Sequence, residues 1–260
     1  MTARPARVVV VAATPRTGSN LVCEALTAAT GERRGGHEPF AELWRQMTSG
    51  ELPWRALTFK GVARRVVRRL QRRPTWRGSA ARHLRRRWLR RRIGALPSGQ
   101  VGADGTFSVK VMWGHYDHLM LRHRLDALVW GAPVTWLYLR RADTVRQAAS
   151  WLRAIQSDVW IHGRSEPRPV EYDERRLQEL VQQAEAEDAR WLAYFAEHGI
   201  VPLTVEYEDL LADYESTIGR AFEFLGYAGR HIPPPALTRQ ADDVSDEWVA
   251  RFSASRRAAS

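Results

Sequence analysis

The chain has 260 residues, of which 44% are hydrophobic and 27% charged, and it is therefore long enough to bury a full hydrophobic core. Its single cysteine excludes an intramolecular disulfide, and no stretch approaches the roughly twenty apolar residues that cross a bilayer. The formal net charge of +11 favours anionic partners or substrates. We expect a cytoplasmic protein that does not span a membrane.

The first expected strand leads into a loop suited to an anion. Residues 8–13 are an apolar run, and residues 14–20 read Thr-Pro-Arg-Thr-Gly-Ser-Asn before an apolar helix begins. Gly18 lets the backbone approach a ligand closely, the first free N–H groups of the helix point toward it, and Arg16 adds a positive charge. The loop therefore predicts a site for an anionic group such as a phosphosulfate.

Two other interpretations of this loop compete with an anion site. It can be an ordinary strand-to-helix turn in which Thr17 or Ser19 caps the helix. A loop that hydrolyses ATP is disfavoured, because such a loop ends in Gly-Lys-Ser/Thr and this one has neither the lysine nor the hydroxyl in that register.

A glycine-rich turn at residues 35–40 and a helix through about Met47 come next, followed by a basic helical insertion over residues 55–100. Residues 60–92 contain fifteen Lys or Arg and no acid, which leaves −4 on the remainder of a chain whose total is +11. Helical spacing of apolar residues predicts two amphipathic helices, interrupted near residues 73–74. The apolar residues are Val62, Val66, Leu70, Leu84 and Trp88.

Three interpretations of the insertion remain open. It can be a solvated arginine-rich face, a surface for anionic lipid or an acidic acceptor, or a nucleic-acid-binding element. No RNA-binding or DNA-binding motif accompanies residues 60–92, so we expect no specific nucleic-acid partner.

Strand and helix patterns alternate along the rest of the chain. The remaining strands are expected at residues 106–112, 133–139 and 200–205. Helices are expected at residues 115–130, after the capping residue Asp143, and at residues 173–197. This order predicts an α/β fold with a mostly parallel sheet flanked by helices, and ligands at the carboxyl ends of the strands.

Four ordered segments carry a family resemblance. They are residues 15–20, Lys-Val-Met-Trp at 110–113, residues 141–154 and residues 240–248. In these segments the chain resembles bacterial carbohydrate sulfotransferases of the trehalose 2-sulfotransferase family, which use 3′-phosphoadenosine 5′-phosphosulfate (PAPS). The resemblance implies one sulfotransferase domain over residues 1–260, with a P-loop-nucleotide-binding-like sulfotransferase fold, and a homodimer.

The resemblance also implies a set of donor-binding residues. Arg16 and the backbone of residues 17–20 would hold the 5′-phosphosulfate, with the backbone groups coming from Thr17, Gly18, Ser19 and Asn20. Arg141 and Ser150 would bind the 3′-phosphate, and Arg140 could substitute for Arg141. Three residues near the end of the chain would close over the nucleotide: Arg239, Gln240 and Ser245. For Ser245, a helix-capping role is the alternative.

Transfer to a hydroxyl needs a base for the acceptor proton and a cation for the leaving phosphate. By resemblance Glu38 is the base, but the family pattern has a second glutamate where this chain has Phe40, so His37 and Glu42 remain alternatives. Arg16 would stabilise the charge that develops on the leaving group. Lys110 and Trp113, with the segment around Glu38, Phe40 and Glu42, would face the acceptor, and no metal is required.

The sequence thus predicts direct in-line transfer of a sulfuryl group from PAPS to a hydroxyl of a sugar, glycolipid or glycosylated metabolite. The basic segment at residues 60–92 would allow a location at the periphery of an anionic membrane. A nucleotide-dependent kinase on a similar fold and a basic nucleic-acid-binding protein are the alternatives from other classes.

Overall fold

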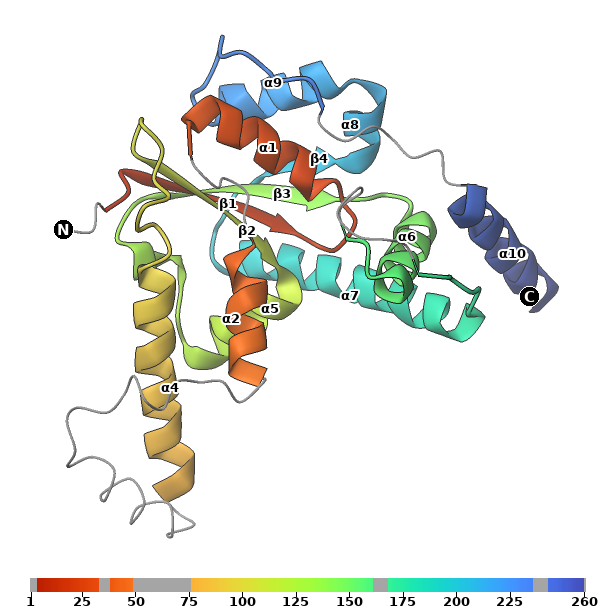
Figure 1. Cartoon of the computed structure of the whole chain (residues 1–260), viewed down its shortest axis with the longest axis horizontal. Helices are drawn as coiled ribbons and strands as arrows, with labels where there is room; N and C mark the ends of the chain where they lie inside the picture. Colours follow the sequence, from red (N-terminus) through yellow and green to blue (C-terminus); the bar gives the residue numbers. More distant parts are fainter. Residues whose placement is uncertain (1–3, 33–37, 49–75, 161–167, 236–242, 260) are drawn as a thin grey trace.

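The computed structural model describes residues 4–32, 38–48, 76–160, 168–235 and 243–259. Its centre is one parallel sheet with the strand order β2-β1-β3-β4 (Figure 1). The strands are β1 (Arg7–Ala13), β2 (Thr106–Met112), β3 (Val134–Arg140) and β4 (Leu203–Glu206). Helices flank the sheet, so the predicted α/β class with a parallel sheet is confirmed.

Strand β1 is apolar throughout because helices cover both faces of the sheet. Side chains alternate across a strand, so Val8 and Val10 pack on one face while Val9 and Val11 pack on the other. On the second of these faces lie α1 (Ser19–Thr30), α8 (Tyr207–Ala212) and α9 (Tyr214–Phe224). The first face is covered by α2 (Pro39–Thr48), α4 (Trp76–Gly94), α5 (Trp113–Leu119) and α7 (Glu174–Glu197).

A further layer builds on α7. Helix α6 (Thr144–Ser157) packs against α7, and α10 (Asp243–Ala259) packs against α6. Asp143 caps α6 by accepting a hydrogen bond from the N–H of Arg146, as the sequence predicted. Trp248 and Phe252 of α10 are buried in this layer, so the C-terminal helix is tied to the body of the fold.

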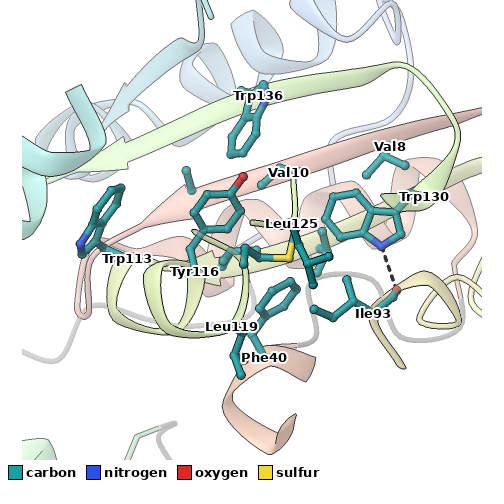
Figure 2. Close-up of a cluster of buried hydrophobic side chains, with 14 of the residues drawn as sticks. Val8, Val10, Phe40, Ile93, Trp113, Tyr116, Leu119, Leu125, Trp130 and Trp136 are labelled. Carbon is teal, nitrogen blue, oxygen red and sulfur yellow. Dashed lines mark hydrogen bonds between the residues drawn. The ribbon is translucent and has the colours of Figure 1, made fainter. Parts of the chain in front are cut away.

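Aromatic side chains dominate the core under α2, α4 and α5 (Figure 2). Tyr116 packs edge-on against Trp136, and both rings contact Trp191 of α7. The indole N–H of Trp130 donates to the carbonyl of Ile93, which fixes the end of α4 to the segment after α5. The described half of the insertion is therefore part of the core.

The predicted helix over residues 115–130 is wrong. Helix α5 ends at Leu119, and two short 3₁₀ helices follow, η1 (Leu121–His123) and η2 (Ala127–Trp130). Arg124 adopts a left-handed conformation with φ 52°, which ends the first, and the Asp126 carboxylate caps the second. Apolar spacing misled the prediction because Leu128 is 76% exposed rather than part of a buried stripe.

The insertion also differs from its prediction. The expected first basic helix falls in residues 49–75, which lie outside the described residues. The second exists as α4, but its buried stripe is Trp88, Leu89 and Ile93, whereas Leu84 is 38% exposed. Within the described ranges, no helix is both long and apolar enough to cross a membrane.

All four strands deliver their carboxyl ends to one edge of the sheet. The register pairs Ala13 of β1 with Met112 of β2 on one side and Leu139 of β3 on the other, and pairs Arg140 with Glu206 of β4. The residues that follow these strands are therefore neighbours, and they form the candidate site.

Candidate functional site

The loop after β1 is held in a backbone conformation that requires glycine. Gly18 has φ 74° and precedes α1, and a Cβ there would lie 2.8 Å from the Tyr207 ring. The Thr17 hydroxyl donates to the carbonyl of Thr14, and no side chain caps α1. The alternative of a turn capped by Thr17 or Ser19 is therefore wrong, and the first N–H groups of α1 keep no side-chain acceptor among the described residues.

Helix α6 braces this loop from the side. The amide nitrogen of Gln147 donates to the hydroxyl of Thr14 and to the carbonyl of Pro15, both at 2.8 Å. Ser150, one turn later, accepts from the Nε of Arg16 at 3.0 Å. Two residues of one helix face thus fix the position of the predicted anion loop.

Three arginines converge beside the loop. The Nη1 atoms of Arg16 and Arg141 donate to the carbonyls of Trp160 and Arg16, respectively. Burial lowers the pKa of Arg16, and the positive charges of Arg141 and Arg153 lower it further. Neighbouring cations that are buried or half-buried repel one another and are stabilised by an anionic ligand, so this cluster supports a second anionic group beside the loop.

The two arginines at the end of β3 have different surroundings. Arg141 is buried and its guanidinium lies 4.3 Å from the centre of the Tyr207 ring. The Nε of Arg140 instead lies 3.9 Å from a carboxylate oxygen of Asp188 and 3.7 Å from one of Glu206. Arg140 thus lies near two carboxylates, and the Nε of Arg141 lies near one, 3.9 Å from an oxygen of Glu208. Only Arg141 also donates to the loop, at the carbonyl of Arg16, and this contact favours Arg141 as the anion ligand.

Glu38 lies directly before α2 and is held by a lysine and a histidine from other elements. Its Oε2 is 3.4 Å from the Nζ of Lys110 on β2, and its Oε1 is 3.2 Å from the Nδ1 of His115 on α5. The His115 ring is near enough for a hydrogen bond but is not aligned for one. Lys110 also donates to the Oδ1 of Asn20 at 2.7 Å, and so links Glu38 to the first turn of α1.

The same contacts keep Glu38 ionised. Burial raises the pKa of its carboxyl, but His115 and the charge of Lys110 outweigh burial and leave the pKa below its usual range. At neutral pH Glu38 is therefore a carboxylate that can accept a proton. Its side chain is 24% exposed, so it keeps access to solvent or a ligand.

Other residues predicted for the acceptor side lie elsewhere. Phe40 is completely buried and Trp113 is 7% exposed, with its ring packed edge-on against Trp191. These two side chains form core contacts that position α2 and α5, and neither faces the site. Glu42 is bound to its own helix, through Arg45 and Gln46, and not to the Lys110 cluster.

Near the end of the chain only part of the prediction can be placed. Ser245 lies inside α10, so the helix-capping alternative is wrong, and its hydroxyl accepts from Arg153 at 3.3 Å. The predicted residues His37, Arg239 and Gln240 lie outside the described residues.

Sequence reasoning missed several residues of this site, namely His115, Gln147, Arg153 and Tyr207. A signal existed for α6, because Gln147, Ser150 and Arg153 recur every three residues and share one face of a helix. His115 and Tyr207 follow strands whose ends only the sheet brings together, and no spacing in the sequence marks them.

Potential metal ligands and the single thiol were located in the described part of the chain. In the described part of the chain, no three His, Cys, Asp or Glu side chains are grouped so that they could hold a metal ion. Cys23 is buried in α1, and burial raises the pKa of its thiol to about 12, so it stays protonated.

Comparison with known proteins gives consistent matches. The model of the Stf0 sulphotransferase family matches residues 8–255. A trehalose 2-sulfotransferase from Mycolicibacterium smegmatis is 32% identical over 177 residues, which cover 62% of this chain and 63% of the relative. One from Mycobacterium tuberculosis is 28% identical over 167 residues, which cover 58% and 62%. The matches thus span slightly less than two thirds of the length of either relative.

Proposed function

Because this chain belongs to the Stf0 sulphotransferase family, we propose that it transfers a sulfuryl group from PAPS to a hydroxyl of a sugar, glycolipid or glycosylated metabolite. The observation that carries the proposal is the position of Lys110, which contacts both Glu38 and Asn20. An ionised carboxylate and a loop suited to bind an anion therefore belong to one site.

In the proposed reaction the acceptor oxygen attacks sulfur in line with the leaving phosphate. Glu38 takes the proton of the attacking hydroxyl, an S–O bond to the acceptor forms, and the S–O bond to the phosphate breaks. The electron pair of the broken bond leaves with adenosine 3′,5′-bisphosphate. Arg16 and the N–H groups at the start of α1 stabilise this developing charge, because Arg16 belongs to the loop that leads into α1.

The donor assignment rests on two separate places for anions. The loop after β1, with Arg16, would hold the 5′-phosphosulfate, and a cluster of Arg141 and Ser150, which both contact Arg16, would hold the 3′-phosphate. Arg153 joins this cluster in the proposal, because its charge acts on Arg16 and it lies one turn beyond Ser150. PAPS carries anionic groups at two positions, and ATP has no 3′-phosphate, so the arrangement favours PAPS.

For the acceptor we propose a sugar hydroxyl. The support is the family, together with the two relatives named as trehalose 2-sulfotransferases. His37, for which the structure gives no position, stays an alternative base, and Glu42 is a weaker one because Arg45 and Gln46 occupy its carboxylate. A homodimer and a cytoplasmic location stay predictions.

The first test is thermal stabilisation by adenosine 3′,5′-bisphosphate, compared with magnesium-ATP and a short DNA duplex. A ligand at a hundredfold excess over its Kd stabilises the native state by about 2.7 kcal/mol, so a selective shift with the bisphosphate is expected. A shift with only ATP or only DNA would instead support the kinase or the nucleic-acid-binding alternative.

The second test separates the base from the donor site. Glu38→Gln should lower turnover of PAPS by roughly a factor of 10² to 10⁴, the usual contribution of a general base, while bisphosphate binding stays unchanged. Glu42→Gln, on the first turn of α2, is the matched control and should retain activity. Normal turnover in Glu38→Gln would move the role to His37, or to Glu42 if Glu42→Gln is the variant that loses activity.

A further inference from the structure

Helix α4 presents a dense positive surface that the proposed reaction does not use. Six of its described arginines are exposed: Arg85, Arg86, Arg87, Arg90, Arg91 and Arg92. None of them contacts a carboxylate of the described residues. Arg86 donates to the carbonyl of Arg124 and Arg92 to the side chain of Gln46, which are neutral acceptors.

Core contacts on one side of α4 keep these arginines on the surface of the protein. Trp88, Leu89 and Ile93 are buried against the sheet, and the Trp130 indole bonds to the carbonyl of Ile93. Figure 1 shows α4 extending away from the sheet, far from α9 and α10. A helix anchored along one stripe cannot rotate its arginines inward, so they stay available to a partner outside the protein.

Positive charges this close together oppose one another. Neighbouring arginines on one helix destabilise it unless counterions or an anionic partner reduce the repulsion. The effect reaches nearby groups: burial lowers the pKa of His123, and the charge of Arg85 lowers it further. The surface is therefore complementary to a dense array of negative charge.

Apolar side chains are exposed beside these arginines. Leu128, on the 3₁₀ helix η2 that packs against α4, is 76% exposed, and Leu84 of α4 is 38% exposed. Cationic side chains next to exposed leucines are typical of elements that bind a membrane interface, where the charges meet headgroups and the apolar groups enter the acyl boundary. A nucleic-acid surface offers no such apolar layer.

We propose that α4, together with η2, binds the surface of an anionic phospholipid bilayer. The docking depends only on these charges and leucines, and it does not rest on the proposed function.

The test is co-sedimentation of the full chain with vesicles, in the absence of donor and acceptor. Vesicles containing about one third phosphatidylglycerol are compared with pure phosphatidylcholine at low and at physiological salt. Arg85, Arg87 and Arg91 are replaced together by Gln, and the matched control replaces three exposed arginines elsewhere, Arg175, Arg220 and Arg257. Both variants change the net charge by the same amount.

The wild-type chain and the control should bind anionic vesicles, more weakly as salt rises. Each arginine near a membrane surface contributes about fivefold to binding, so the α4 variant should bind on the order of a hundredfold more weakly. Leu128→Ser should weaken binding a few-fold, including at high salt, because it removes apolar contact rather than charge. If the α4 variant does not keep the wild-type far-UV spectrum, Arg90→Gln with Arg91→Gln replaces it.

Three results would overturn the proposal. The first is an equal loss of vesicle binding in the α4 variant and in the control. The second is equal binding of the wild-type chain to neutral and to anionic vesicles. The third is tighter binding of a DNA duplex than of anionic vesicles at the same salt. The last would assign α4 to nucleic acid. Since no donor is present, failure here leaves the proposed sulfotransfer untouched.

Discussion

At the scale of single residues, the loop after β1 concentrates backbone strain and charge at Arg16. This residue has φ 69°, a left-handed conformation that non-glycine residues adopt at a cost of about 1–3 kcal/mol. Its guanidinium is nevertheless held by Ser150 and by the carbonyl of Trp160. The strain is consistent with a functional loop, because the surrounding contacts fix the side chain where an anion would bind.

The two neighbouring arginines at the end of β3 allow a matched test of the donor site. Arg141→Ala should weaken the binding of adenosine 3′,5′-bisphosphate much more than that of adenosine 5′-phosphate, because only the bisphosphate carries a 3′-phosphate. The expected loss of binding free energy is roughly 1.5–3 kcal/mol, the usual value for a hydrogen bond to a charged group. Arg140→Ala should leave both affinities nearly unchanged, since Arg140 contacts Asp188 and Glu206. Titration calorimetry with both nucleotides measures the difference. Equal losses for both nucleotides in Arg141→Ala would reject the contact.

The charge of Lys110 should set the acidic limit of activity. With Glu38 as the base, turnover requires its carboxylate form. The lowered pKa keeps this carboxylate ionised at pH values below the usual glutamate pKa of about 4.3. Lys110→Met removes a charge that lowers this pKa while burial, which raises it, remains. The acidic limb of the kcat profile should therefore move to higher pH. Arg45→Met, an exposed cation on α2, is the control, and an identical shift in both variants would contradict the assignment.

At the scale of elements, the free edge of the sheet is closed by a buried acid. β2 is an edge strand, and the carboxylate of Glu32, just after α1, accepts from the N–H of Ser108 at 2.8 Å and from its hydroxyl at 2.6 Å. Burial raises the pKa of Glu32 to about 7, and the hydrogen bonds from Ser108 only partly offset burial. α1 and β2 are thus joined by a group that titrates near neutral pH.

This pKa predicts a loss of stability as pH rises. The folded chain holds the Glu32 proton more tightly than the unfolded chain, whose glutamate has a pKa near about 4.3. The stabilisation is complete below the unfolded pKa and is lost as pH rises through about 7, a change of roughly 3 kcal/mol in the free energy of unfolding. Urea unfolding of the wild type and of Glu32→Gln, at intervals of about 1 pH unit from pH 5 to pH 8, measures the free energy of unfolding of each. The free energy of unfolding of the wild type, relative to that of Glu32→Gln, should fall as pH rises. A difference that stays constant with pH would contradict the raised pKa. Exchange of the exposed Glu215 for Gln controls for losing a carboxylate.

At the scale of the whole molecule, the described half of the basic insertion is part of the common core. Leu89 and Ile93 of α4 are completely buried in the same cluster as Val8 and Val10 of the central strand. The core on the other face of the sheet shares β1, so both layers meet at one strand. We therefore expect the described elements to unfold together, as the predicted single domain over residues 1–260 requires.

Two leucines on one helix test this expectation. Leu89→Ala should destabilise the chain by roughly 2–5 kcal/mol, the usual cost of such a cavity, and should shift the near-UV and far-UV unfolding transitions together. Leu84→Ala, at an exposed position of α4, should change the free energy of unfolding by less than about 0.5 kcal/mol. A Leu89→Ala transition that splits in two would show that α4 unfolds separately.

Local chemistry in the sequence determined much of the fold. The apolar run at residues 8–13, the capping residue Asp143 and the apolar spacing of α7 each act within one element, so the strands, α6 and α7 could be predicted. The helix predicted over residues 115–130 failed because leucine spacing reports apolar character and not burial. Leu128 is exposed, and the turn at Arg124 depends on packing against α4.

For the site, the sequence by itself determined the loop after β1, with Arg16 and Gly18, and the alternation of strands and helices that brings the strand ends to one edge. Only the tertiary structure showed the different surroundings of Arg140 and Arg141, placed Phe40 in the core, and brought His115 and Lys110 to Glu38. The physical reason is that these contacts join residues distant in the chain, and the pairing of parallel strands sets their distances. Side chains that meet across a sheet edge leave no periodic signal in the sequence. A glycine with positive φ and an apolar strand depend on neighbouring residues only, so the sequence alone can reveal them.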